Sequence, residues 1–154
     1  MNLTEQFRSL NYKNFNINMT EFVNENKLNS QTNYLIVTSL QNKYTYIFQR
    51  KGDSWIQLYK WICTVGKQLT PTVKGMFKIT GRKIGFGTEL YSVKYATRII
   101  GRYYYHSILY DKTGKYIIDG RLGMALSHGC IRLKVNNAKW IYENIPDGTT
   151  VIIA

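Results

Sequence analysis

Apolar and β-branched residues recur at short intervals along most of this chain, and the pattern predicts strands instead of long helices. The first run is almost continuously apolar, and the second alternates aromatic with smaller or polar residues. Short polar turns at 41–42 and 51–53 separate three runs, which cover residues 34–40, 43–49 and 54–65. Consecutive runs joined by turns this short predict an antiparallel meander.

The second half of the chain continues in the same style. Further strands are predicted at 76–80, 92–99, 103–110 and 150–153. Gly101-Arg102 would turn one hairpin, because glycine accepts a positive φ angle. Residues 111–114, with the sequence Asp-Lys-Thr-Gly, would turn another hairpin.

Helical spacing is found in two places. Near the C-terminus, apolar residues recur at helical intervals between Asn136, a suitable N-cap, and Pro146, which would end the helix. Near the N-terminus, Asn18 could cap a short helix. Three apolar residues would share one face of this short helix, namely Met19, Phe22 and Val23.

These elements predict one main domain that is preceded by a shorter segment. Residues 1–32 otherwise follow no period, so we expect an N-terminal extension or linker there, with one short helix. Residues 33–154 contain many strands and few helices. They predict a mainly β domain, a β-sandwich or partly closed barrel with one or two short helices.

The charge of the chain narrows the choice of partners. The formal net charge is +12, from 21 basic and 9 acidic residues. Such an excess predicts an anionic partner, and both nucleic acid and an anionic cell envelope meet this requirement. The basic residues are spread along the sequence without a long run, so they indicate a general positive field and not a charged tail.

The apolar segments are too short for a membrane span, which needs about 18 or more consecutive apolar residues. Residues 1–14 also lack the apolar stretch of a secretory signal peptide. Two expectations are compatible with this start: an intracellular protein, or a chain that begins after an export segment has been removed.

The sharpest chemical feature is the segment Ser127-His128-Gly129-Cys130-Ile131-Arg132-Leu133. Its cysteine lies in a glycine-containing turn, whereas Cys63 lies inside an apolar run, which is typical of a core cysteine. Attack on an amide needs a thiolate, a base and hydrogen-bond donors for the oxyanion. Cys130 is therefore the candidate nucleophile.

His106 and His128 are the two histidines of the chain. His128 is two residues from Cys130, and in a turn its ring need not face the sulfur. His106 lies on a predicted strand and could approach the sulfur from across the fold, lowering the thiol pKa and forming an ion pair. We assign His106 as base and His128 as a supporting residue. Gly129 suits an oxyanion site, because its N–H and that of Cys130 can point at a bound carbonyl.

Other uses of these side chains stay open from the residues alone. A histidine on a strand among tyrosines is often an ordinary core or surface residue. His106, His128, Cys130 and Cys63 supply the ligand types of a zinc site, although the usual ligand spacings are absent. A disulfide between Cys63 and Cys130 is a further alternative, and it would silence the nucleophile.

Residues 127–133 resemble the signature of the L,D-transpeptidase catalytic domain (YkuD-like) family, Ser/Thr-His-Gly-Cys followed by an aliphatic residue and Arg or Asn. The family also places a histidine upstream, where this chain has His106. Further segments resemble the family in the same order along residues 33–154, including 64–67, 70–71, 75–79, 136–139 and 147–151. Val65 departs from the family, which usually has a small residue before the glycine.

The resemblance implies a mainly β-sandwich fold and a peptidoglycan L,D-transpeptidase. Cys130 would attack the tetrapeptide stem after the L-centre of its third residue, release D-Ala and pass the acyl group to an amine of another stem. His106 would be the base, with the Ser107 carbonyl orienting it. The N–H groups of His128, Gly129 and Cys130 would form the oxyanion site. Ser127 would fix the turn, and Arg132 would support the site or a substrate carboxylate.

The family also implies partners and a location. The partners would be peptidoglycan stem peptides and carbapenem-type β-lactams that acylate the same thiol, with no nucleic acid. Neither a metal nor an organic cofactor is implied. The family acts outside the membrane, so we expect an extracellular protein of the cell wall or envelope whose export segment is missing from this sequence. In that setting residues 1–32 could also be the remnant of a preceding wall-binding region.

Two rival functions share these residues. If water takes the acyl group, the protein is an L,D-carboxypeptidase or a peptidoglycan peptidase. A catalytically idle basic module that binds cell wall or nucleic acid is the second rival, and it predicts that Cys130→Ala leaves all activity intact. The identity of the third stem residue and the oligomeric state are not readable from the sequence.

Overall fold

The computed structural model describes all 154 residues. The helices are α1 (Leu3–Ser9), α2 (Met19–Glu25) and α3 (Val135–Asn144). The strands are β1 (Tyr34–Ser39), β2 (Tyr44–Lys51), β3 (Ser54–Ile62), β4 (Val65–Gly66), β5 (Gly75–Lys78), β6 (Arg82–Gly87), β7 (Ser92–Ile100), β8 (Tyr103–Ser107), β9 (Leu109–Tyr110), β10 (Ile117–Asp119), β11 (Ala125–Ser127), β12 (Ile131–Leu133) and β13 (Thr150–Ile153). The predicted mainly β fold is confirmed. None of the helices is long and apolar enough to cross a membrane.

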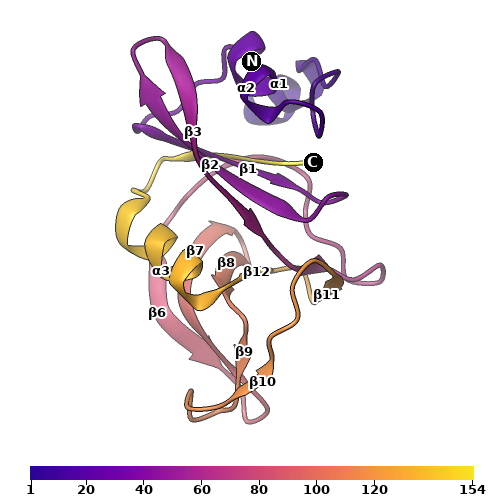
Figure 1. Ribbon diagram of the computed structural model, residues 1–154, viewed down its shortest axis with the longest axis vertical. Helices are drawn as coiled ribbons and strands as arrows, with labels where there is room; N and C mark the ends of the chain where they lie inside the picture. Colours follow the sequence, from indigo (N-terminus) through magenta and orange to yellow (C-terminus); the bar gives the residue numbers. More distant parts are fainter.

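Two sheets form separate layers, which Figure 1 shows one above the other. The first sheet has the strand order β3-β2-β1-β13-β5, with β1 and β13 parallel and every other pair antiparallel. The predicted meander is its β1-β2-β3 part. The second sheet has the order β10-β9-β7-β8-β12, with β6 paired to β7. A short pair, β11 and β4, lies beside the layers and leads the chain into the functional site.

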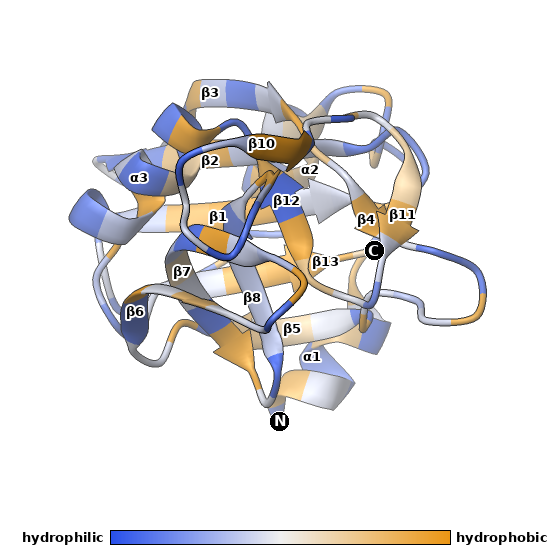
Figure 2. Ribbon diagram, turned by 90° about the horizontal axis from the view of Figure 1, so that it is seen from below, coloured by the Kyte–Doolittle hydropathy of each residue, from blue (hydrophilic) through white to orange (hydrophobic).

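The central strands β1 and β13 of the first sheet are buried on both faces, which explains why β1 is almost continuously apolar. Leu35 and Val37 of β1 join a cluster with α2, whereas Ile36 joins the core between the two sheets. A strand with two buried faces needs apolar residues at successive positions instead of alternating ones. Figure 2 shows the interior β13 coloured as hydrophobic and α3 carrying hydrophilic residues.

The N-terminal helices cover the outer face of the first sheet (Figure 1). Asn18 caps α2 as predicted, because its side chain accepts a hydrogen bond from the Glu21 N–H at 3.0 Å. The predicted apolar face of α2 is buried, with Phe22 and Val23 fully inaccessible. Helix α1 was not predicted; its apolar residues Leu3 and Phe7 are only partly buried where they pack against the cluster that contains α2.

Helix α3 closes one side of the space between the sheets. Ala138, Ile141 and the following Ile145 lie in the inter-sheet core. The prediction that Asn136 caps this helix is wrong: the helix begins at Val135, and the cap position is Lys134 with no side-chain cap bond. Packing of the apolar stripe of α3 therefore fixes this helix without a polar N-cap.

Two predicted strands are interrupted in the structure. The run 54–65 divides into β3 and β4, and the run 103–110 divides into β8 and β9. At the second break, the Ile108 N–H donates to the carbonyl oxygen of Leu133 at 3.0 Å. This contact ties the end of β8 to the end of β12, where the candidate site is built.

Candidate active site

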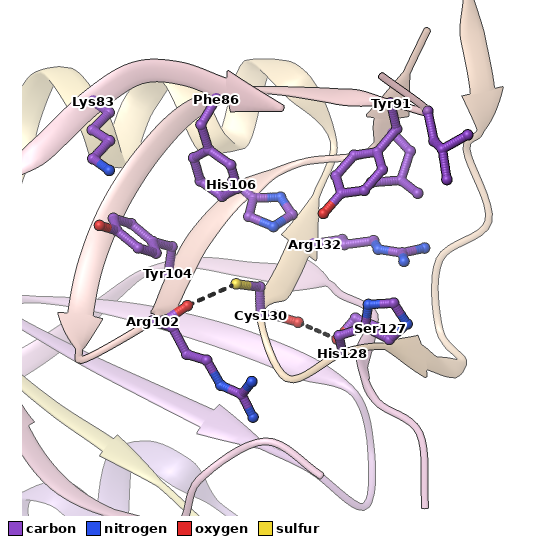
Figure 3. Close-up of a pocket in the computed structure, with 12 residues that line it drawn as sticks. Lys83, Phe86, Tyr91, Arg102, Tyr104, His106, Ser127, His128, Cys130 and Arg132 are labelled. Carbon is purple, nitrogen blue, oxygen red and sulfur yellow. Dashed lines mark hydrogen bonds between the residues drawn. The ribbon is translucent and has the colours of Figure 1, made fainter. Parts of the chain in front are cut away.

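A pocket with a volume of about 490 Å³ opens on the second sheet, and Figure 3 shows its lining. This volume is in the range of small-molecule sites. The lining comes from β6, β8, β9, β11, β12 and the loops that join them, so segments far apart in the sequence meet there. Its 12 residues are Lys83, Phe86, Leu90, Tyr91, Arg102, Tyr104, His106, Leu109, Ser127, His128, Cys130 and Arg132.

The turn between β11 and β12 presents Cys130 to this pocket. The Ser127 hydroxyl accepts a hydrogen bond from the Gly129 N–H at 3.0 Å and donates one to the Cys130 carbonyl at 2.6 Å. Gly129 has φ +127°, and a Cβ there would lie 2.6 Å from the Tyr103 ring. Both the backbone angle and the contact therefore require glycine.

The segment between β4 and β5 supports the turn from outside. The Thr72 hydroxyl donates to the Gly129 carbonyl at 2.8 Å and accepts from the Gly66 N–H at 2.9 Å. The Thr70 hydroxyl donates to the Ser127 carbonyl at 2.8 Å. These bonds show that residues 66–72 hold the cysteine turn in place. In the sequence the two segments appear only as separate motifs.

His106 reaches the pocket from β8, directly beside β12. The two strands are parallel, and His106 is paired in register with Arg132. Its Nδ1 lies 2.7 Å from the Ser107 carbonyl oxygen, which can only accept, so Nδ1 carries the proton. The neutral ring then has its free lone pair on Nε2. The structure therefore holds the ring in the tautomer that a general base requires.

Burial lowers the pKa of His106; the Ser107 carbonyl opposes this shift and the nearby charge of Arg132 adds to it, and the net pKa is about 4. The ring is neutral at physiological pH as a result. The His106 ring also packs against the Phe86 ring in a T-shaped arrangement, with the two ring centroids 5.6 Å apart and the planes at 89°. Phe86 in turn packs against Tyr104, with the ring centroids 5.4 Å apart, so aromatic side chains form one side of the histidine's surroundings.

The Cys130 thiol donates a hydrogen bond to the Arg102 carbonyl at 3.4 Å, and no hydrogen bond joins its Sγ to either histidine. Burial raises the pKa of this thiol, whereas a backbone bond at Tyr104 and the charges of Arg132 and Arg102 oppose the rise. The sequence suggested a lowered thiol pKa and an ion pair with His106. The structure instead holds a neutral thiol and a neutral imidazole, because both groups are shielded from water.

The three backbone N–H groups expected at the oxyanion site differ in whether they already have a hydrogen-bond acceptor. The Gly129 N–H is already donated to Ser127. The N–H groups of His128 and Cys130 have no acceptor, so two of the three expected donors are free. The exposed His128 ring lies on the Arg132 side of the pocket in Figure 3, away from the sulfur, whereas the His106 ring lies above Cys130.

Arg132 is held by a carboxylate that the sequence did not reveal. Its Nη1 lies 3.3 Å from Asp119 Oδ2, on β10. Hydrogen bonds from Arg121 and the charges of both arginines lower the pKa of Asp119 to about 2. Asp119 lies in a short strand within a polar loop, 13 positions before Arg132, and no local pattern connects the two residues.

Neither alternative use of the cysteines fits the geometry. Both thiols are free, and Cys63 is fully buried in the core between the sheets, so the suggested disulfide is wrong. The same burial separates Cys63 from the other three side chains of the suggested zinc site. No group of three or more His, Cys, Asp or Glu side chains is placed to hold a metal ion.

The family model described as the L,D-transpeptidase catalytic domain (YkuD) matches residues 33–153. A Bacillus subtilis (strain 168) protein, YciB, whose name presents it as a candidate L,D-transpeptidase, is 46% identical over 56 residues, covering 35% of this chain and 29% of that protein.

Solved structures share the fold. A fused Zn-dependent amidase/peptidase/peptidoglycan-binding domain-containing protein from Clostridium acetobutylicum ATCC 824 matches with a TM-score of 0.75 and 38% identity, covering 88% of this chain and 58% of that one. An L,D-transpeptidase from Mycobacterium smegmatis matches at 0.62 and 24% identity, over 79% of this chain and 58% of that one. The L,D-transpeptidase LdtMt1, solved with imipenem, matches at 0.63 and 20% identity, over 79% and 59%. This chain spans less than two thirds of the length of each relative.

Proposed function

Because the chain belongs to the L,D-transpeptidase catalytic domain family, we propose that it is a cysteine-nucleophile acyltransferase that cross-links peptidoglycan stem peptides. One observation carries the proposal. Cys130 and His106 line the same pocket, and the Ser107 carbonyl fixes His106 so that its Nε2 is free to accept a proton. We assign residues 33–154 to the catalytic domain and residues 1–32 to an extension.

In the first step, the Cys130 thiol exchanges its bond with the Arg102 carbonyl for one with His106 Nε2. The imidazole takes the thiol proton, and the sulfur attacks the carbonyl carbon after the third residue of a tetrapeptide stem. The free N–H groups of His128 and Cys130 then receive the oxyanion. Such donors contribute about 3–4 kcal/mol each to transition-state stabilisation.

The tetrahedral intermediate then collapses. The carbon–nitrogen bond breaks, His106 returns its proton to the departing D-Ala amine, and a thioester to Cys130 forms. A side-chain amine of a second stem attacks the thioester, the carbon–sulfur bond breaks, and the thiol is protonated again. The product is a cross-link between the third residues of two stems. No metal or organic cofactor enters this sequence.

The Ser127 hydroxyl, which holds both Gly129 and Cys130, has a structural role in this mechanism, and His128 acts through its free backbone N–H. Arg132 is proposed to bind a substrate carboxylate. The substrate places the protein at the cell wall, where the net charge of +12 suits an anionic envelope. A structural relative was solved with imipenem, and we propose that carbapenems acylate Cys130 in the same pocket.

Intact-mass measurement after incubation with a carbapenem tests the nucleophile. We expect a single adduct that is absent in Cys130→Ala and retained in Cys63→Ala, the matched control for the second thiol. An adduct that persists without Cys130 would overturn the assignment.

Product masses from purified muropeptides test the fate of the acyl group. Transfer to an amine gives a dimer without the donor D-Ala, as proposed. Release of a shortened monomer alone would identify an L,D-carboxypeptidase or peptidoglycan peptidase instead. Wall binding without any product, unchanged in Cys130→Ala, would identify an idle binding module.

A further inference from the structure

The middle of strand β7 contains a backbone conformation that strands rarely adopt. Tyr95 has φ +55°, in the left-handed region, although it lies inside a strand and is not a glycine. Bulky residues are outliers in this region, because the Cβ atom approaches the backbone too closely there. Such a conformation persists only where the surrounding structure holds it, and it is found most often at functional sites.

The bend at Tyr95 interrupts the pairing of β7 with its neighbour. After the pair that β7 makes with Tyr105 of β8, no ladder pair follows until the one with Tyr110 of β9. Both pairs belong to the same register, so an uninterrupted ladder would place Tyr95 opposite Ser107. Ser107 is therefore a residue of β8 that the bend releases from regular pairing.

The Ser107 hydroxyl occupies the gap that this interruption leaves. Ser107 is fully buried, and its hydroxyl accepts a hydrogen bond from the Lys94 N–H at 2.8 Å. The same hydroxyl donates to the Ile108 carbonyl at 2.8 Å. A side chain thus replaces the backbone acceptor that the N–H beside the bend would have in a regular ladder, and no buried donor is left unpaired.

Helix α3 supports the bend from the other side. The Tyr95 ring packs against the Tyr142 ring of α3, with the ring centroids 5.5 Å apart. The Lys139 ammonium group of the same helix lies 6.0 Å from the centroid of the Tyr95 ring. The helix itself packs against β7 and β8 (Figure 1). These contacts provide the external support that a left-handed tyrosine requires.

The residue that the bend releases is the one that orients the candidate base. The Ser107 carbonyl accepts the hydrogen bond from His106 Nδ1 at 2.7 Å. A carbonyl that pairs across a ladder lies in the plane of the sheet, whereas side chains project from its faces. A carbonyl that is free of the ladder can turn out of this plane toward the imidazole ring. The bend therefore supplies the condition on which the bond to His106 depends.

We propose that Tyr95 is a positioning residue for the base. Its left-handed bend, anchored by the Ser107 hydroxyl, frees the Ser107 carbonyl from the ladder and so holds His106 with its proton on Nδ1. Tyr95 does not line the pocket and acts only through Ser107. This inference rests on the proposed function, since it identifies what positions the base of that same site.

Two matched substitutions separate the backbone conformation from the ring. Tyr95→Val and Tyr95→Asn both remove the ring, but a β-branched residue strongly disfavours positive φ, whereas asparagine tolerates it. Nitrogen NMR of isotope-labelled histidine reports which ring nitrogen carries the proton. The pKa of His106 is about 4, so its ring is neutral near neutral pH and the tautomer is read directly. A His128→Gln background leaves His106 as the only labelled ring.

We expect a single tautomer in the wild-type residue 95 background, with the proton on Nδ1. Tyr95→Val should give a mixture of tautomers and at least about tenfold slower carbapenem acylation of Cys130, because a base in the wrong tautomer cannot accept the thiol proton. Tyr95→Asn should restore the single tautomer and most of the rate. A single tautomer in Tyr95→Val, or an equal mixture in Tyr95→Asn, would overturn the inference.

Ser107→Ala tests the same link if thermal unfolding shows that Tyr95→Val does not fold. It removes the hydroxyl that anchors the bend and leaves the carbonyl in the chain. A tautomer mixture in this variant supports the inference, and an unchanged single tautomer contradicts it. The NMR readout does not depend on activity. Absence of a carbapenem adduct on wild-type Cys130 would refute the proposed function, whereas an adduct with one tautomer in every variant would refute the role of Tyr95 alone.

Discussion

The two cysteines lie in two regions of opposite character, an aliphatic core and a polar turn beside a pocket. Cys63 is fully buried among aliphatic side chains between the sheets, and burial raises its pKa to about 12. Cys130 lies in a polar turn at the rim of the second sheet, in a pocket lined by three cations. Burial also raises the pKa of Cys130, but a backbone bond and two arginines oppose that rise.

This difference shows that burial alone does not make a thiol reactive. Both thiols are protonated at rest, so neither is a preformed nucleophile. Cys130 differs in having an imidazole with a fixed tautomer in the same pocket, free backbone donors beside it and space for a ligand. Thiol reactivity in this domain therefore depends on the groups that the second sheet places around the sulfur. The first sheet supplies only structural support.

Removal of the base should have the largest effect on the reactivity that distinguishes Cys130 from Cys63. General-base steps contribute about 10²–10⁴-fold, so His106→Ala should slow carbapenem acylation of Cys130 by that factor. In the wild type the rate should fall on the acid side only as the pH approaches the His106 pKa of about 4. Stopped-flow measurement of acylation across pH checks both points, and an acid limb near the ordinary histidine pKa would contradict the buried, neutral ring.

The same shift should appear in stability. The pKa of His106 is 6.5 in the unfolded chain and about 4 in the folded one. The unfolded state therefore binds more protons between these values, and the free energy of unfolding falls as the pH falls through this window. The slope should reach about 1.4 kcal/mol per pH unit and vanish above the window. Urea unfolding of the wild type and of His106→Gln should differ in this slope, and equal slopes would argue against it.

Disruption of the turn that carries Cys130 should have the next largest effect. Gly129→Ala places a Cβ 2.6 Å from the Tyr103 ring at φ +127°, which should cost about 1–3 kcal/mol of stability and slow acylation by displacing Cys130. Gly52→Ala is the matched control, because Gly52 has φ +59° and an open surrounding. It should cost less and leave acylation unchanged. Equal losses of acylation in both variants would show that the turn is not the sensitive element.

Truncation in the core should have the smallest effect. Cys63→Ala removes one buried atom and should lower the free energy of unfolding by about 1–2 kcal/mol without changing the acylation rate. Cys130→Ala should leave stability within about 0.5 kcal/mol, since its thiol is partly exposed. Thermal unfolding of both variants measures this reversal. A larger stability loss in Cys130→Ala than in Cys63→Ala would remove the distinction between the two regions.

Much of the first sheet could be predicted from the sequence. Its strands lie within a few residues of the predicted runs, because apolar residues at successive positions report two buried faces directly. Strand β6 was missed because Gly85 and Gly87 interrupt its pattern, and both glycines are needed where the neighbouring backbone approaches within 2.6 Å of their Cβ positions. The Asn136 cap failed because packing of α3 outweighs a single capping bond.

The sequence by itself determined the β1-β2-β3 meander, much of the apolar core and the turn that carries Cys130, since all three depend on residues that are near neighbours in the chain. Tertiary structure alone decided that Thr72 holds the Gly129 carbonyl, that Asp119 anchors Arg132 and that Phe86 packs against His106. These contacts join separate segments of the chain, and their geometry depends on how the sheets pack. Local periodicity records which faces are buried, but it carries no information about which distant side chains meet.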